Sequence, residues 1–293
     1  MSIIQIRNSS LAASVSTLGA EQQSLTRDGL EYIWQGDPAY WAKRAPFLFP
    51  HVGVLKDGVA VHRDGKTYTL GNHGFAKDME FTPVNCRNDH AEFVLEANNE
   101  TLAVYPYPFR FKISYALSGS ALRVSMEVIN TGNSPLPFGM GGHTAFRIPL
   151  KAANQFSDYS ITFEKKEHQS CPLYKDKVLH VDKTRLMLNN TNVLPLRYED
   201  FKDDALMFEG LKSSALELAV PGSKNGIHFR WKGFSMLGIW TPPNKNAPFL
   251  CLEPWTSGPG RSDEDSVFDK KHNILLLKPG ESYTAWYEIE PMR

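Results

Sequence analysis

The chain has 293 residues, which is long enough to bury a substantial core without disulfide bonds or a structural metal. Its 32 basic and 32 acidic residues give a formal net charge of zero. That balance argues against proteins that bind nucleic acid or anionic membranes through a basic surface, so we expect neither partner.

The N-terminal residues MSIIQIRNSSLAASVST do not resemble a signal peptide, because Gln5 and Arg7 interrupt the apolar run. No window approaches the roughly 20 consecutive apolar residues of a membrane span. The three cysteines, Cys86, Cys171 and Cys251, form no C-x-x-C pair and are expected to be reduced thiols. These features predict a cytoplasmic protein.

Hydrophobic residues recur mostly with a period of two. Apolar and polar residues alternate over 109–117 and again over 122–128, on either side of Ser118-Gly119-Ser120. This pattern predicts a β-hairpin. Similar alternation occurs in five further segments, at 91–97, 214–220, 227–231, 235–241 and 283–290.

Helical periods are scarce, glycine-containing turns recur, and the composition shifts nowhere along the chain. We therefore predict one all-β domain over residues 1–293, a large sandwich of antiparallel sheets. Within it, residues 249–255 (FLCLEPW) indicate a buried strand that ends on Glu253. Pro254 has no N–H to donate and is expected to end the ladder. A buried carboxylate is usually paired, at a rim, or functional.

Three short stretches combine ionisable residues with glycine or proline, at 72–78 (NHGFAKD), 138–146 (FGMGGHTAF) and 252–255 (LEPW). Taken alone, each histidine could be a hydrogen-bonded loop or core residue, and Glu253 could pair with a lysine or arginine. Together, two imidazoles and a partly buried carboxylate suffice for concerted proton transfer, because histidine titrates near neutrality and desolvation makes a carboxylate more basic.

Over nearly its whole length the chain resembles the aldose 1-epimerase (galactose mutarotase-like) family, and in particular its LacX-like branch. Five segments in this order carry the resemblance: RAPFLFPHVGVLKDG at 44–58, GKTYTLGNHGFAKD at 65–78, GMGGHTAF at 139–146, FKDDALMFEGL at 201–211 and LCLEPW at 250–255. The resemblance implies a β-supersandwich that interconverts the α and β anomers of a free hexose without a cofactor or a metal. The substrate partner is a small sugar, and the protein is expected to be a monomer or homodimer.

Motif matches assign the catalytic residues. Glu253, in the Glu-Pro element, matches the general base. His143, in the Gly-x-His-x-x-Phe element, matches the general acid. His73, in the His-Gly element, matches a histidine that helps hold the sugar.

The resemblance also implies four substrate-binding residues: Asp204, Arg44, Lys77 and Trp255. Asp204 would bind a sugar hydroxyl, and Arg44 matches an arginine that lines the site. Lys77 stands where many relatives have arginine, which replaces a bidentate contact with a point charge. Trp255 follows the Glu-Pro element where galactose-active relatives have an aspartate-rich tail, so galactose is not implied as the preferred sugar.

Several alternatives remain open. The protein could act on a hexose 6-phosphate, with Arg44, Lys56 and Lys77 as phosphate partners, or bind sugar without catalysis. Two histidines and a glutamate could also hold zinc, although the spacing lacks short helix-borne pairs. Glu253 and Asp204 could instead be the paired carboxylates of a glycosidase. Phe75 and Phe146 could cover the sugar or belong to the ordinary core.

Overall fold

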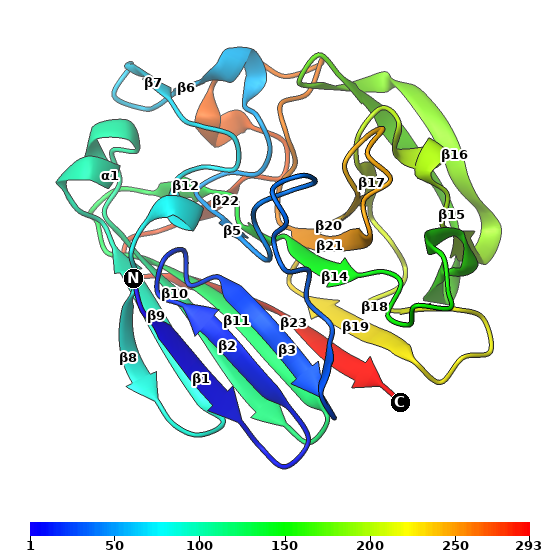
Figure 1. The fold of residues 1–293 in the computed structure, drawn as a ribbon. Helices are drawn as coiled ribbons and strands as arrows, with labels where there is room; N and C mark the ends of the chain where they lie inside the picture. Colours follow the sequence, from blue (N-terminus) through cyan, green and yellow to red (C-terminus); the bar gives the residue numbers. More distant parts are fainter.

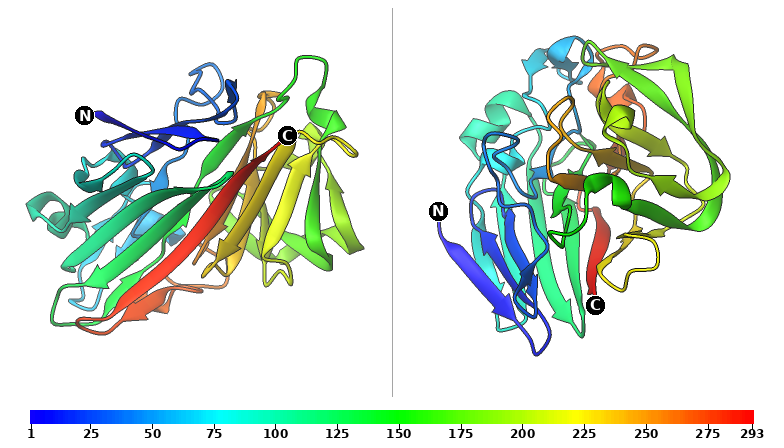
Figure 2. Two further views of the ribbon diagram at one scale, coloured as in Figure 1. Left: turned by 90° about the horizontal axis from the view of Figure 1, so that it is seen from below. Right: turned by 45° about the vertical axis from the view of Figure 1, so that its right-hand side comes forward.

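A computed structural model describes residues 1–293, and antiparallel strands make up most of its regular structure (Figure 1). The largest element is a nine-stranded sheet. In spatial order its strands are β16 (Val178–Pro195), β15 (Ser160–Lys175), β18 (Ala215–Ala219), β19 (Gly226–Lys232), β23 (Ser282–Met292), β11 (Ala121–Asn130), β10 (Phe109–Ser118), β9 (His90–Glu96) and β8 (Thr82–Cys86). This sheet forms one layer of the sandwich (Figure 2).

Two smaller sheets cover the inner face of the nine-stranded sheet. The first has four strands, β1 (Ile3–Arg7), β2 (Ala12–Ser16), β3 (Gln22–Arg27) and β4 (Leu30–Glu31). The second has six, β17 (Leu206–Glu209), β20 (Met236–Trp240), β21 (Phe249–Trp255), β13 (Gly141–Gly142), β5 (Phe47–Leu48) and β14 (Thr144–Arg147). The six-stranded sheet carries the candidate site described below.

The remaining elements are short. Two small sheets pair β12 (Leu136–Phe138) with β22 (Leu275–Leu277) and β6 (Val59–Val61) with β7 (Thr67–Thr69). The single α-helix, α1 (Asn99–Val104), is capped at its N-terminus by Asn98, whose side chain accepts a hydrogen bond from the N–H of Thr101. Five 3₁₀ turns lie at Lys56–Gly58, Ala76–Asp78, Phe156–Asp158, Tyr198–Phe201 and Phe268–Lys270. No helix is long and apolar enough to cross a lipid bilayer.

The predicted hairpin is confirmed as β10 and β11, whose register runs from Phe109 opposite Asn130 to Ser118 opposite Ala121. The five other alternating segments form β9, β18, β19, β20 and β23. Alternation places every second side chain in one core of 60 buried residues shared by both layers. The antiparallel β-sandwich predicted from the sequence is therefore confirmed.

Phe75 and Phe146 belong to this core rather than to the sugar site. Phe146 is completely buried, and Phe75 packs against the core beside Phe49 and Phe109. Neither ring lines the cavity described below. Of the two readings left open for these rings, ordinary packing is the one the structure supports.

Candidate active site

Strand β21 separates two environments by strict alternation of its side chains. Leu250 and Leu252 point into the main core. On the opposite face, Cys251 packs into a small aromatic cluster, and Glu253 and Trp255 line a cavity. A period of two therefore places Glu253 on the cavity face of a strand that is buried along its whole length.

The expectation that the ladder ends at Pro254 is wrong. Strand β21 continues to Trp255, and Leu237 of β20 lies opposite Pro254. On the other side of β21 the pairing is interrupted. Leu252 pairs with Thr144 and Trp255 pairs with Gly141, but the two residues between them on each chain are not paired with each other. Proline lacks the N–H that a continuous ladder needs on that side, and the partner chain is divided there into β13 and β14.

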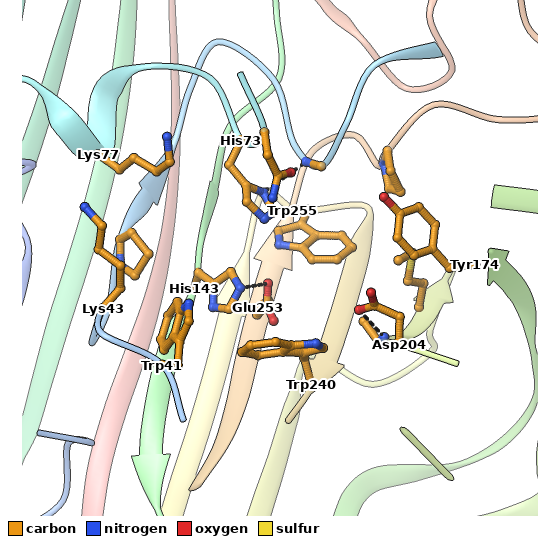
Figure 3. A pocket seen from close by; sticks show the side chains of 16 residues that line it. Trp41, Lys43, His73, Lys77, His143, Tyr174, Asp204, Trp240, Glu253 and Trp255 are labelled. Atoms are coloured by element: carbon orange, nitrogen blue, oxygen red, sulfur yellow. Dashed lines mark hydrogen bonds and ion pairs between the residues drawn. The ribbon is translucent and has the colours of Figure 1, made fainter. Parts of the chain in front are cut away.

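The cavity has a volume of about 270 Å³ and opens between the six-stranded sheet and the surrounding loops (Figure 3). Lys43 and Lys77 lie at one end, and Asp204 and Tyr174 lie at the other. His73, His143, Glu253 and Trp255 lie between these ends. Six of the seven predicted site residues thus line one cavity, although they come from distant parts of the sequence.

His143 and Glu253 are in direct contact at the base of the cavity. The register that pairs Thr144 with Leu252 and Gly141 with Trp255 places His143 opposite Glu253. Its Nε2 atom lies 3.2 Å from Oε2 of Glu253. Both residues are buried, with exposures of 6% and 1%. One proton can therefore be shared between an imidazole and a carboxylate held on adjacent strands.

Burial shifts the two groups of this pair in opposite directions. Loss of solvation raises the pKa of Glu253 well above its usual value, and the carboxylate of Asp204 raises it further. Loss of solvation lowers the pKa of His143 well below its usual value, and the nearby His73 lowers it further. Both shifts favour an uncharged pair, with its proton on the carboxyl group.

His73 is held in one tautomer by a contact with the loop that contains Gly53. The backbone N–H of Gly53 donates to the ring atom Nδ1 of His73 at 3.0 Å. The backbone N–H of His73 donates back to the carbonyl of Gly53 at 2.9 Å. Burial and the neighbouring Lys77 lower the pKa of His73 to about 3. Because Nδ1 accepts a hydrogen bond, the neutral ring carries its proton on Nε2, where it can donate to a bound oxygen.

The backbone around His73 explains the His-Gly pair. His73 has a φ of 64° and Gly74 a φ of 69°, so two consecutive residues adopt the left-handed region. A Cβ atom at Gly74 would collide with the carbonyl group of Phe49. Glycine is therefore required there to bring the His73 loop against the strand at Phe49, and this contact turns the imidazole toward His143, with ring centres 5.5 Å apart.

Asp204 and Trp255 reach the cavity through equally specific local geometry. Asp204 has a φ of 131°, and Oδ1 accepts a hydrogen bond from the N–H of Ala205 at 2.8 Å. Burial raises the pKa of this carboxyl group. The indole of Trp255 needs the glycines on both neighbouring strands, because a Cβ atom at Gly141 or Gly238 would lie 2.5 Å from its ring atoms.

The basic residues are arranged differently from the prediction. Arg44 does not line the cavity, and its guanidinium donates to Oε1 of Gln23 and to the carbonyl of Gln35. The adjacent Lys43 lines the cavity in its place. Lys43 and Arg44 lie in an irregular segment with a bend at Arg44, so the path of this loop decides which of the two side chains faces the cavity.

Lys77 does line the cavity, but its ammonium group already has hydrogen-bond partners. Its Nζ donates to Oδ2 of Asp78 at 2.7 Å and to the carbonyl of Gly74 at 2.9 Å. The other oxygen of Asp78 accepts from Nζ of Lys43 at 3.0 Å. One carboxylate thus links the two lysines at this end of the cavity.

Two tryptophans that line the cavity, Trp41 and Trp240, could not be predicted from the sequence. Trp41 stacks on the His143 ring at 4.8 Å with an angle of 27° between the planes, and Trp240 meets the same ring edge-on at 5.5 Å. Trp41 comes from a loop, where no periodic pattern marks it. Trp240 ends a strand that the alternation did predict, but nothing in that pattern distinguishes a cavity face from a core face.

Known proteins resemble this chain over its whole length. The family model for aldose 1-epimerase matches residues 2–290. Two LacX proteins of Lactococcus lactis, one plasmid-encoded and one chromosomal, are 31% and 32% identical to this chain over 98% of each sequence. The structure of a galactose mutarotase related enzyme from Lactobacillus acidophilus superposes with a TM-score of 0.94 at 31% identity, over 100% of this chain and 98% of that one. The chain belongs to the aldose 1-epimerase family of sugar isomerases, and within it resembles LacX.

Proposed function

We propose that the protein is a cofactor-independent mutarotase that interconverts the α and β anomers of a free hexose. The observation that carries this proposal is the 3.2 Å contact between His143 and Glu253 at the base of a sugar-sized cavity. An acid and a base held this close can act on two neighbouring oxygens of one ring, which are the anomeric hydroxyl and the ring oxygen.

The reaction requires only proton transfers. Glu253 as carboxylate removes the proton of the anomeric hydroxyl, while His143 as imidazolium protonates the ring oxygen. The C1–O5 bond breaks, the aldehyde rotates about C1–C2, and the reverse transfers close the ring on the other face. The reacting pair carries the same single proton as the uncharged pair described above, so sugar binding has only to move that proton from Glu253 to His143.

Other cavity residues would position the sugar. The Nε2–H of His73 is a fixed neutral donor for a sugar oxygen. The carboxylate of Asp204 points into the cavity from the opposite side and is suited to accept from sugar hydroxyls (Figure 3). Trp255 and Trp240 supply aromatic surface for the C–H groups of the ring.

A hexose 6-phosphate is the second candidate substrate, because Lys43 and Lys77 lie together at one end of the cavity. The free hexose is favoured because Asp78 already accepts from both lysines. A phosphate would have to compete with that carboxylate for both ammonium groups, whereas a neutral sugar leaves the arrangement intact.

The decisive experiment uses freshly dissolved single anomers of glucose, galactose and their 6-phosphates, followed by polarimetry or NMR exchange. We expect equilibration of a neutral hexose to be accelerated, with proton transfer contributing about 10²–10⁴-fold.

A binding protein would leave every rate at its spontaneous value. A glycosidase acting through Glu253 and Asp204 would release nitrophenol from a nitrophenyl glycoside, which a mutarotase would not do. Activity that survives a chelator would argue against a catalytic zinc.

A further inference from the structure

Three side chains of different chemistry converge beneath the cavity. Cys251 and Glu253 are two residues apart on β21 and therefore share one face, and His143 lies opposite Glu253 on the neighbouring chain. One ligand atom from each residue lies within 4.8 Å of the other two. All three residues are buried, and Cys251 has no exposed surface.

We propose that these residues form an inhibitory site for a soft divalent cation, represented by Zn²⁺. The site would use a ring nitrogen of His143, Sγ of Cys251 and a carboxylate oxygen of Glu253. Nitrogen, thiolate and carboxylate are the ligand types that zinc prefers, and three protein ligands with one open position form a common zinc arrangement. The fourth position would face the cavity.

The present geometry requires only a small rearrangement. Tetrahedral zinc with bonds of about 2.0–2.3 Å separates its ligand atoms by roughly 3.3–3.8 Å. The separations here therefore have to shorten by about 1.5 Å at most, which rotation of the Cys251 and Glu253 side chains can provide. Two polar atoms are available, because Oε1 of Glu253 and Nδ1 of His143 are buried without hydrogen-bond partners.

Occupation of the site would stop proton transfer, and this consequence rests on the proposed function. The cation would take a lone pair from His143 and one from Glu253. The single proton of that pair and the thiol proton of Cys251 would both leave to solvent. Neither His143 nor Glu253 could then exchange protons with a sugar. The alternative role for Cys251 is packing alone, within the aromatic cluster that includes Trp34 and Phe249.

The chain supplies matched cysteine controls. Cys86 is exposed, and Cys171 is buried away from the cavity. We would titrate ZnCl₂ into mutarotation assays of wild type, Cys251→Ala and Cys86→Ser, each normalised to its own uninhibited rate. Zinc should inhibit wild type and Cys86→Ser equally, and a chelator should reverse the inhibition. Cys251→Ala should require at least about tenfold more zinc for half inhibition. Loss of a partner that orients a ligand lowers metal affinity by about 10- to 100-fold, and loss of the ligand itself should cost at least as much. Equal zinc sensitivity of all three proteins would overturn the proposal.

Cobalt provides a readout that does not depend on activity. One equivalent of Co²⁺ should give tetrahedral d–d bands and a thiolate-to-cobalt charge-transfer band in wild type. The same spectrum should persist in the double variant Cys86→Ser/Cys171→Ser, which keeps Cys251 as its only thiol. Loss of the charge-transfer band in that variant would refute the site even if Cys251→Ala did not fold. A normal cobalt spectrum in a protein without mutarotase activity would instead contradict the proposed function and leave the metal site standing.

Discussion

The backbone N–H of Gly53 donates to Nδ1 of His73 at 3.0 Å. This single contact joins two loops that are 20 residues apart in the sequence and determines which nitrogen of the imidazole carries the proton. Because burial also lowers the pKa of His73 to about 3, the ring stays neutral throughout the physiological range. His73 is therefore suited to donate one hydrogen bond rather than to transfer protons with the solvent.

Replacing His73 with asparagine should separate its two roles. The Asn side-chain oxygen can occupy the place of Nδ1 and keep the bond to Gly53, and asparagine tolerates the positive φ of this position. The donor at Nε2 is lost, so we expect kcat/KM for the hexose to fall by about tenfold or more. His73→Gln, which extends a donor toward Nε2, should recover part of the loss. Equal activity of the Asn variant and wild type would remove His73 from substrate contact.

Glu253→Gln should abolish most of the activity while leaving the fold intact. The amide is nearly isosteric with the carboxyl group but cannot accept the proton of the anomeric hydroxyl. The loss, about 10²-fold or more, should therefore appear in kcat rather than in KM. Glu96→Gln, at an exposed residue paired with Arg110, is the matched control. Retention of near wild-type kcat in Glu253→Gln would exclude this carboxylate as the base.

The sequence allowed the sandwich and the principal site residues to be predicted for different reasons. Alternation along β10, β11 and β23 is a local signal, because a strand with one buried face must repeat every two residues. Glu253 and His143 were found through their short motifs. Their contact depends on the register between β21 and the 141–147 chain, which no local pattern specifies.

The missed and misplaced residues have a common physical origin. Lys43 and Arg44 are neighbours in an irregular loop, and the sequence does not specify which of the two side chains turns toward the cavity. Trp41 reaches His143 only after a loop folds over the six-stranded sheet. For Phe146, the sequence left sugar stacking and core packing equally open, and its position on β14 turns the ring into the core. Tertiary packing decides each case.

The pH dependence of kcat/KM should be bell-shaped, with both limbs belonging to the His143–Glu253 pair. The active pair carries one proton, so activity falls at low pH when the pair gains a second proton and at high pH when it loses its only one. His143→Asn should lower the rate and remove the basic limb. The acidic limb that remains should lie above the ordinary carboxyl range, because burial raises the pKa of Glu253. An unchanged basic limb in this variant would assign the acid to another group.

Gly238→Ala should damage the site without altering any polar group. The added Cβ would lie 2.5 Å from Cη2 and Cζ2 of Trp255, so the indole must move. Since the ring lines the cavity beside Glu253, we expect kcat/KM to fall by at least about tenfold, with a change in tryptophan fluorescence. Gly71→Ala, where nothing lies within 4 Å of the added atom, should stay close to wild type. Identical kinetics for the two variants would show that the position of Trp255 does not matter for the reaction.

Lys77→Met tests whether the lysine end of the cavity binds the substrate. Lys77 donates to Asp78 and to the carbonyl of Gly74, and Asp78 also accepts from Lys43. If the substrate is a neutral hexose, the ion pair is a partly exposed feature of the rim that contributes only about 0–1 kcal/mol. We then expect KM for glucose or galactose to change by less than about threefold, which corresponds to roughly 0.7 kcal/mol.

A phosphorylated substrate would give a different result in the same variant. A charge-assisted hydrogen bond to phosphate is worth about 1.5–3 kcal/mol, so losing Lys77 would raise KM by roughly 10- to 150-fold. Lys112→Met, at a lysine paired with Glu127 outside the cavity, is the control for removing a positive charge. If glucose 6-phosphate is the better wild-type substrate and only its KM rises in Lys77→Met, the free hexose is not the substrate. The lysines would then release Asp78 to bind the phosphate, and the rim contact seen here would be the resting arrangement of a phosphate site.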